Sequence, residues 1–210
     1  MMAHAYALLR GEVEANTAAR EASLDVQQRD LELALQHVPD HVRYLDQLAD
    51  AQIAANRLLL AEFTLQKLTA LRPTWPYGWA KLAHVRLLNH DYGPATRSAL
   101  QAAVRFSGRD QIMLDWLYMT AINYWGQFDA ETRAALIEAI RRIDFDHNPQ
   151  LLAYAMDHRG VPILCEQTQI SGLTWCAQAQ QYLKDCDLSA AGAMQDCRQR
   201  LQSLKNWRDA

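Results

Sequence analysis

Four cysteines are the residues with the clearest potential for chemistry, and all of them lie near the C-terminus: Cys165, Cys176, Cys186 and Cys197. Their spacings are 11, 10 and 11 residues, whereas zinc sites usually contain ligand pairs about two to four residues apart. An even number of cysteines in a short segment with little apolar core is typical of disulfide bonding. We therefore favour two disulfides, and with them an oxidising compartment, over a zinc site or buried free thiols.

The secondary structure expected for this tail selects one of the three possible pairings. An extended segment is expected first, followed by the two helices of a hairpin, over residues 161–170, 173–184 and 190–207. Cys176 and Cys186 would lie along one helix, about 15 Å apart at roughly 1.5 Å per residue. Most of the second helix would separate Cys186 from Cys197. Because a disulfide needs Cα atoms within about 7 Å, the prediction is Cys165–Cys186 with Cys176–Cys197.

The remaining polar residues do not have the spacing of a catalytic or metal-binding motif. His37 and His41 are separated by Pro39, which ends the helix between them, so both are expected in a turn. A calcium loop is suggested by three residues, Asp144, Asp146 and Asn148. Its sixth and twelfth positions, which need Gly and Glu, hold Pro149 and Ala155. With no HExxH pair, phosphate loop or nucleophile elbow, we expect neither enzymatic activity nor a metal or organic cofactor.

The composition is that of an ordinary globular protein and excludes several classes of function. Of the 210 residues, 50% are hydrophobic and 21% are charged, and the net charge is −3. Lys and Arg form no block that would predict nucleic-acid binding, and no apolar run approaches the roughly 20 residues of a membrane span. The start, Met1–Tyr6, does not resemble a signal peptide. Its doubled Met suggests a start codon placed before an internal fragment, which leaves room for a natural anchor or signal upstream.

An internal repeat underlies the fold prediction. Pro39 and Pro73 lie 34 residues apart, which is the tetratricopeptide period. The first unit, starting at Val42, places the expected large and small residues at Leu45, Leu48, Ala49, Ala61, Leu65, Leu68 and Pro73. The second, starting at Pro76, places Trp79, Leu82, Ala83, Ala95, Ala99 and Ala102, but has Ser107 where Pro is expected. The small residues are needed where two helices cross closely.

The repeat predicts two antiparallel helix pairs, Val42–Ala54 with Leu58–Leu71 and Tyr77–Leu88 with Gly93–Phe106. A degenerate third unit begins near Asp110 with Met113, Trp116 and Leu117, and its second helix covers about 131–143. The predicted fold class is all-α, a tetratricopeptide-like helical repeat (α-solenoid) with a C-terminal cysteine-containing helical hairpin. Its parts are an N-terminal helical segment, the repeats and the hairpin, over 1–37, 38–160 and 161–210. A non-repetitive helical bundle is the alternative.

Repeat geometry also predicts which residues face a binding groove. The inward positions of the first helices hold Arg43, Asp46, Asp50, Tyr77 and His84. Asp46 and Asp50 would repel a peptide carboxylate, so a carboxylate ligand is not expected there. The aromatic residues around the second and third units either belong to the core or line a groove for a peptide or a sugar chain.

One stretch has a resemblance to a known family. Residues 71–83, with the sequence LRPTWPYGWAKLA, are followed by a helix and Asp91-Tyr92. This pattern resembles the VpsP-like proteins of bacterial exopolysaccharide gene clusters, over about residues 25–145. The resemblance implies a membrane-anchored helical-repeat protein whose repeats lie outside the cytoplasm, with an accessory role in polysaccharide synthesis or export. It supplies no catalytic residues.

The predicted function is therefore a non-catalytic interaction scaffold in an exopolysaccharide biosynthesis or export machinery. Its expected partners are proteins of a membrane-associated complex or a polysaccharide, without nucleic acid and without a membrane span in this chain. The expected location is periplasmic or otherwise extracytoplasmic. The alternative is a generic tetratricopeptide adaptor in an unrelated complex, including a cytoplasmic one.

Overall fold

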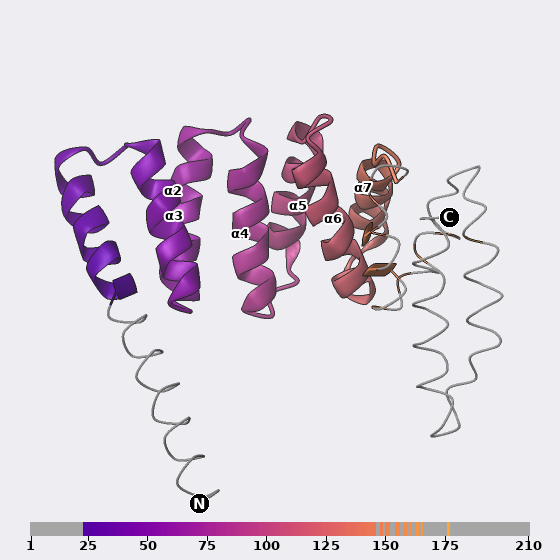
Figure 1. Cartoon of the computed structure of the whole chain (residues 1–210), viewed down its shortest axis with the longest axis horizontal. Coiled ribbons are helices and arrows are strands. Elements are labelled where there is room, and N and C mark those ends of the chain that lie inside the picture. Colours follow the sequence, from indigo (N-terminus) through magenta and orange to yellow (C-terminus); the bar gives the residue numbers. More distant parts are fainter. Residues whose placement is uncertain are drawn as a thin grey trace, which may run out of the picture. The chain divides into compact units, whose positions relative to one another are not determined.

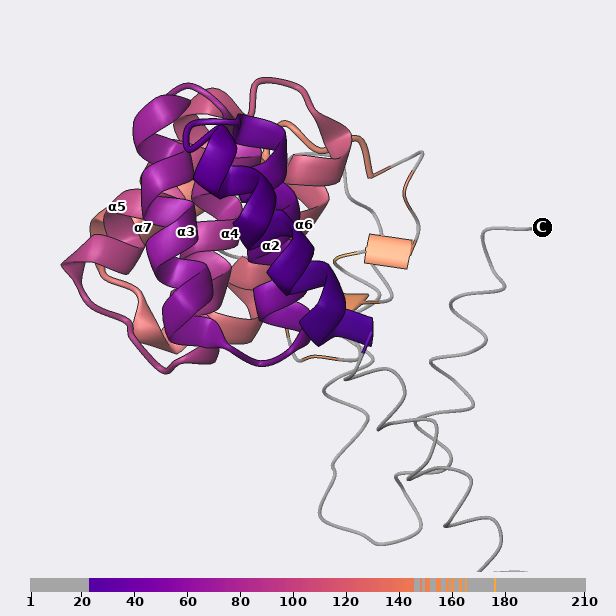
Figure 2. The ribbon, with the colours of Figure 1, turned by 90° about the vertical axis from the view of Figure 1, so that its left-hand side faces the viewer.

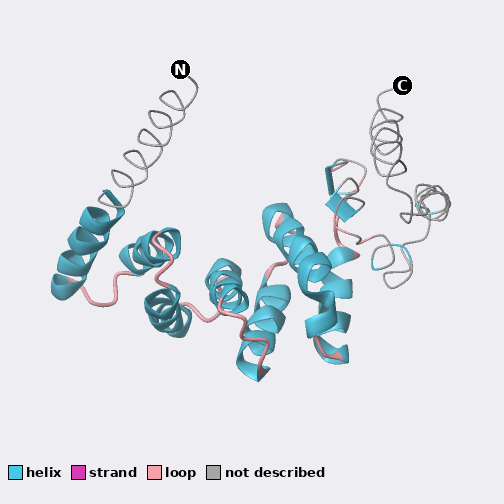
Figure 3. Ribbon diagram, turned by 90° about the horizontal axis from the view of Figure 1, so that it is seen from below, coloured by secondary structure: helices cyan, strands magenta, loops and turns pink. Residues whose placement is uncertain are grey.

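The computed structural model describes residues 23–145 continuously, and then residues 148, 150, 151, 154, 155, 158, 160, 163, 165 and 176. These residues are helices, turns and loops, and none of them lies in a strand (Figure 3). The all-helical prediction is thus confirmed for this part of the chain. Two compact units are present, one ending at Phe106 and the other beginning at Ser107. Among the described residues, no helix combines the length and the apolar character needed to cross a lipid bilayer.

The first unit consists of consecutive helices joined by short turns. After a helix over residues 23–37 come α2 (Val42–Ala54), α3 (Leu58–Leu71), α4 (Pro76–Leu88) and α5 (Pro94–Phe106). Their axes run alongside one another (Figure 1), and α3 packs against both α2 and α4, while α4 also packs against α5. Because each helix packs on the next through a turn of a few residues, successive helices are antiparallel. This packing of neighbours is consistent with a helical repeat.

The N-terminal helix is held to the first pair by polar contacts. Figure 2 turns the unit so that the helix over residues 23–37 faces the viewer, in front of α2 and α3. The Arg57 guanidinium bonds to Gln28 and Asp25 on that helix. At the other end, Lys67 Nζ donates to the carbonyl oxygen of Pro39 at 2.6 Å. The expected helix before the first repeat is therefore present and anchored at both ends.

The turns show why the helices start and stop where they do. Two residues after the end of the first helix of each pair, the backbone adopts a positive φ. The angle is 55° at Asn56, after α2, and 57° at His90, after α4. The next backbone N–H then reaches back to the helix, from Arg57 to the Gln52 carbonyl at 2.8 Å and from Asp91 to the Arg86 carbonyl at 2.9 Å. This is the Schellman type of helix end. The two ends lie 34 residues apart, so the backbone itself repeats with the predicted period.

The buried side chains repeat with the same period in the first helices only. In α2 and α4 the offset is 34, pairing Leu48, Ala49, Ala51 and Gln52 with Leu82, Ala83, Val85 and Arg86. In α3 and α5 it is 35, pairing Ala61, Thr64, Leu65, Leu68 and Thr69 with Thr96, Ala99, Leu100, Ala103 and Val104. The assignment of Ala95 and Ala102 to core positions is therefore wrong: Ala95 is exposed and Ala102 is half-buried.

A longer turn accounts for this shift. Residues 89–93 join α4 to α5, whereas only residues 55–57 join α2 to α3. The extra residues include Gly93, whose N–H donates to the Asp91 carboxylate at 2.7 Å and closes a local turn. With the offset of 35, the position of Pro73 corresponds to Gly108, not to the residue before it. Gly108 has φ +56°, which the ring of a proline excludes.

The second unit contains α6 (Gln111–Tyr124), the short 3₁₀ helix η1 (Trp125–Gln127) and α7 (Ala130–Ile140), with α6 packed against α7. Asp110 and Asp129 cap α6 and α7 through their carboxylates. The degenerate third unit is therefore helical as predicted, and of its predicted residues Met113 and Leu117 are buried, whereas Trp116 is half-buried. The residues that follow Trp79, Leu82 and Ala83 by 35 positions are Leu114, Leu117 and Tyr118, all buried.

Tyr118 occupies the position that holds a small residue in the first unit. Its side chain is completely buried, its hydroxyl donates to the Leu151 carbonyl at 2.8 Å, and its ring meets Phe145 edge-on at 5.6 Å. Burial raises the pKa of the phenol, so it remains protonated. A large ring here requires α6 to pack differently from α2 and α4, which explains why the third unit departs from the repeat pattern.

Replacing Ala83 with Trp tests the repeat packing. Ala83 is completely buried, so we expect the larger ring to overpack the core and to lower the free energy of unfolding by about 1–3 kcal/mol. Ala95→Trp is the matched control, because Ala95 is exposed and should change stability by less than about 0.5 kcal/mol. Urea denaturation measures both. Equal losses for the two variants would mean that the offset of 34 continues through α5.

Candidate functional site

A cavity of about 720 Å³ lies where the first turn of α2 meets the turn between α3 and α4. It is lined by His41, Val42, Arg43, Tyr44, Asp46, Gln47, Arg72 and Trp75. Both arginines are exposed, and the lining combines guanidinium groups, aromatic rings and one carboxylate. All of these residues belong to the first unit.

The N-terminal end of α2 places one wall of this cavity. His41 precedes the helix, and its Nδ1 accepts a hydrogen bond from the Tyr44 backbone N–H at 3.3 Å. The His41 and Tyr44 rings then lie against each other with centroids 3.9 Å apart. Arg43 and Gln47 are four residues apart on the same helix and therefore lie on one face of it. Capping by His41 is thus what brings these side chains together at the helix end.

The turn between α3 and α4 places the opposite wall. The Trp75 backbone N–H donates to the Arg72 carbonyl at 3.1 Å, and the Arg72 guanidinium lies 6.0 Å from the centre of the Trp75 ring. Glycine at position 78 allows the ring to lie close to α4, because a Cβ there would be 3.2 Å from Trp75 Cε3. Trp79 Nε1 donates to the Pro73 carbonyl at 2.8 Å and fixes the turn. The stretch that carries the family resemblance therefore forms this wall.

Lys81 of α4 determines the charge beside the cavity. Its ammonium lies 2.6 Å from Asp46 Oδ1 and 2.7 Å from Asp50 Oδ1, so one cation serves two carboxylates of α2. Burial alone would lower the pKa of Lys81, but its hydrogen bonds and charge interactions with Asp46 and Asp50 outweigh burial and raise that pKa. Lys81 is therefore charged at neutral pH. It links α2 to α4 and compensates the acidic pair.

The structure separates the predicted partner-binding residues into two groups. Arg43 and Asp46 line the cavity, whereas Asp50, Tyr77 and His84 are absent from its lining. The Tyr77 ring lies beside it, 6.0 Å from that of Trp75. Half-buried on α4, His84 has its pKa lowered by burial and is neutral at pH 7.

Sequence reasoning missed Lys81 and Arg72, whereas Trp75 belongs to the aromatic residues that it considered for a groove. The reason for not expecting a carboxylate ligand was repulsion by Asp46 and Asp50, and Lys81 weakens that repulsion by compensating one of their two charges. One signal for Lys81 was available: it lies 35 residues after Asp46, so the two occupy nearly equivalent places in consecutive units. Opposite charges at such places predict a contact between stacked helices.

A second exposed surface is apolar. Leu59 and Phe63 of α3 are each 72% exposed and Leu60 is 50% exposed. Leu60 and Phe63 also line a smaller cavity of about 350 Å³ between the helix over residues 23–37 and the first helix pair. Exposed apolar side chains gathered in this way are a common feature of binding surfaces.

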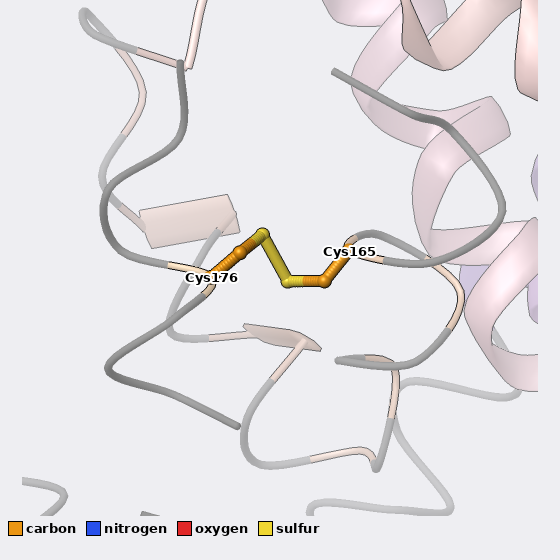
Figure 4. The surroundings of a disulfide bond; sticks show 2 residues. All are labelled: Cys165 and Cys176. Carbon is orange, nitrogen blue, oxygen red and sulfur yellow. A yellow bond between two sulfur atoms is a disulfide. The ribbon is translucent and has the colours of Figure 1, made fainter. Parts of the chain in front are cut away.

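In the second unit the structure pairs Cys165 with Cys176 (Figure 4), with Cα atoms 5.5 Å apart. The predicted pairing is therefore wrong for both residues, while Cys186 and Cys197 lie outside the described part of the chain. The elimination assumed that both bridges of a pairing form together, but a Cys165–Cys176 bridge does not require that Cys186 and Cys197 also pair. Moreover, Ile163 and Cys165 have π-helical backbone where an extended segment is expected.

The chemistry available at the main cavity is that of binding. Guanidinium groups donate paired hydrogen bonds to carboxylates and phosphates, and the neighbouring rings supply apolar contact area. Within the described residues there is no group of three or more His, Cys, Asp or Glu side chains arranged to hold a metal ion. Comparisons of the chain with protein-family models, with curated proteins and with solved structures find no match.

Replacing Lys81 with Met tests its role between the two aspartates. We expect the free energy of unfolding at pH 7 to fall by about 1 kcal/mol, because two carboxylates lose their common cation. The pKa of Lys81 is raised in the folded protein from its ordinary value of 10.5. Its stabilising effect is therefore complete below that pH and is lost as the pH rises through the raised value.

The control for this prediction is the same replacement in a protein that already carries Asp46→Asn and Asp50→Asn. There Lys81→Met should cost much less, because the charge interaction is already gone. Urea denaturation at neutral and alkaline pH provides the measurement. An equal cost in both backgrounds would show that Lys81 contributes through packing of its aliphatic chain alone.

The disulfide is tested by peptide mapping without reduction. Protein produced in an oxidising compartment should yield a linked peptide that contains Cys165 and Cys176. Removing this bridge with Cys165→Ser should lower the stability of the second unit by about 2–4 kcal/mol, since the unfolded chain loses a closed loop. A linked peptide joining Cys165 to Cys186 would restore the pairing predicted from sequence.

Proposed function

We propose that this chain is a non-catalytic interaction scaffold of the tetratricopeptide type, which binds partner proteins. The backbone ends of α2 and α4 repeat with the 34-residue period of that class. Ala49, Ala61 and Ala83 are completely buried at its small-residue positions. Such repeats act by presenting an extended surface built on a regular core, and this supports a binding role.

The observation that carries the proposal is the cavity at the end of α2. Its two arginines are exposed, although they lie on elements whose backbone is tied down by the helix cap of His41 and the Arg72–Trp75 turn. Exposed arginines and aromatic residues on a rigid support are the side chains that contribute most to protein interfaces. The expected partners are proteins of a membrane-associated complex, with polysaccharide as a further ligand class.

An accessory role in bacterial exopolysaccharide synthesis or export is the biological process we propose for the scaffold. Support comes from the resemblance of residues 71–83 to VpsP-like proteins, and these residues include the cavity wall formed by Arg72 and Trp75. The Cys165–Cys176 disulfide is typical of proteins in oxidising compartments, which favours the periplasm or another extracytoplasmic site. A generic adaptor in another complex, including a cytoplasmic one, is the alternative.

Partner capture in the native host tests the binding role. Protein isolated after in-cell cross-linking should bring down a defined partner, and Arg43→Ala with Arg72→Ala should abolish its recovery by removing both exposed guanidinium groups. Arg105→Ala, which changes another exposed arginine of the first unit, is the control and should leave recovery unchanged. Equal recovery with all three proteins would place the binding surface elsewhere.

The same host separates the two processes. Deleting the gene should reduce the amount of exported polysaccharide, measured as cell-free uronic acid and total sugar, if the scaffold belongs to that machinery. Unchanged polysaccharide together with a captured partner would favour the generic adaptor.

A further inference from the structure

We infer that the cavity between α2 and the α3–α4 turn receives an acidic peptide segment of the partner protein, with Arg43 and Arg72 as its anion-binding groups. This inference rests on the proposed function as a protein-binding scaffold and names the chemistry that the scaffold recognises. Asp46 and Asp50 of α2 would repel a peptide carboxylate if they had no cation beside them.

The charges around the cavity favour an anion once their pairing is known. Asp46 is the carboxylate in the lining, and its Oδ1 is 2.6 Å from the Lys81 ammonium, which also neutralises part of the charge of Asp50. Asp40, next to the helix cap, lies 3.1 Å from Lys67 Nζ. The two cavity arginines are exposed, so their guanidinium groups face solvent and are accessible to a ligand.

The helix end reinforces this preference. The cavity is built on the first turn of α2, a helix of 13 residues whose N-terminus follows His41. The N-terminal end of a helix carries a partial positive charge. Arg43 lies in that turn, so its side-chain charge and the helix dipole act on the same region. An acidic side chain in the cavity would therefore meet positive potential from two sources.

The aromatic rings favour a peptide over a sugar chain. Stacking of a sugar requires a free ring face, whereas the His41 and Tyr44 rings lie against each other, 3.9 Å between centroids. The Trp75 ring has the Arg72 guanidinium 6.0 Å from its centre, and its six-membered part is packed close to Gly78. These contacts leave less ring surface for stacking of a sugar, which favours the side chains of a peptide. The volume of about 720 Å³ is within the range of roughly 300–1,000 Å³ for ligand sites.

Fluorescence anisotropy with fluorescein-labelled octaglutamate tests the inference. We expect saturable binding to the wild-type protein that weakens as salt is added, because screening reduces attraction between exposed charges. Arg43→Gln with Arg72→Gln should weaken binding by about tenfold or more, whereas the control Arg105→Gln should not change it. Lys81→Met should also weaken binding, although Lys81 does not line the cavity, because it leaves Asp46 and Asp50 uncompensated.

The reverse change provides a second, independent test. Asp46→Asn with Asp50→Asn should tighten octaglutamate binding. Far-UV circular dichroism of each variant confirms that the helices are intact. Absence of octaglutamate binding to the wild type, or binding that the double arginine variant leaves unchanged, would overturn the inference.

A third ligand distinguishes the source of the anion. Oligogalacturonate that binds through Arg43 and Arg72 where octaglutamate does not would identify an acidic polysaccharide as the ligand and overturn the peptide assignment. If octaglutamate fails but the arginine variants still lose the captured partner, the scaffold function stands and only the acidic-peptide inference fails. If both measurements fail, the cavity is not the binding surface.

Discussion

Ala49, Ala61 and Ala83 are completely buried among the first four helices of the repeat, and the rest of the first unit depends on the close approach that they permit. Helices with large side chains at these points would be held further apart. Close packing lets each antiparallel helix share its buried face with both neighbours, so the turns at their ends are drawn into fixed positions. The cavity is formed by two such ends, which means that its arginines are positioned by alanines in the core.

The ion pairs of Lys81 with Asp46 and Asp50 determine the net charge beside the cavity. Without Lys81, Asp46 and Asp50 would form an acidic surface on α2, and the nearby arginines would mainly compensate it. With the ammonium within 2.7 Å of both carboxylates, the arginines become the side chains that a ligand meets. The same lysine joins the first helix of one pair to the first helix of the next. Its contact therefore links α4 to α2 and also lowers the negative charge beside the cavity.

Much of the fold could be predicted from the sequence because its strongest signals are local. The predicted bounds of α2 and α3 agree with the structure, and those of α4 and α5 differ by one residue at their starts. The 34-residue spacing of Pro39 and Pro73, together with small residues such as Ala49 and Ala83 in the same register, made these helices recognisable. The shift by one residue in α5 could not be predicted, because Ala, Leu and Val are common enough there to satisfy either offset. The exposure of Ala95 and the burial of Thr96 and Ala103 distinguish the two offsets.

The site was less predictable because it depends on which residues meet across helices. Arg43 and Asp46 followed from repeat geometry, but Arg72 and Trp75 lie in a turn for which that geometry makes no statement. The partner of Asp46 is 35 residues away, and composition does not reveal such a contact. The cysteines show the same limitation: the spacing of Cys165 and Cys176 is known from the sequence, but the path of the chain between them decides whether they meet.

The two ends of the helix pairs in the first unit differ in whether the lengths of their connections are constant. At the end that forms the cavity, the connections are residues 38–41 and 72–75, equal in length and both containing a proline. At the opposite end, the connections are residues 55–57 and 89–93, which differ in length. The difference in length at one end therefore leaves the spacing at the cavity end constant. A unit built in this way can change its length without moving the side chains that line the cavity.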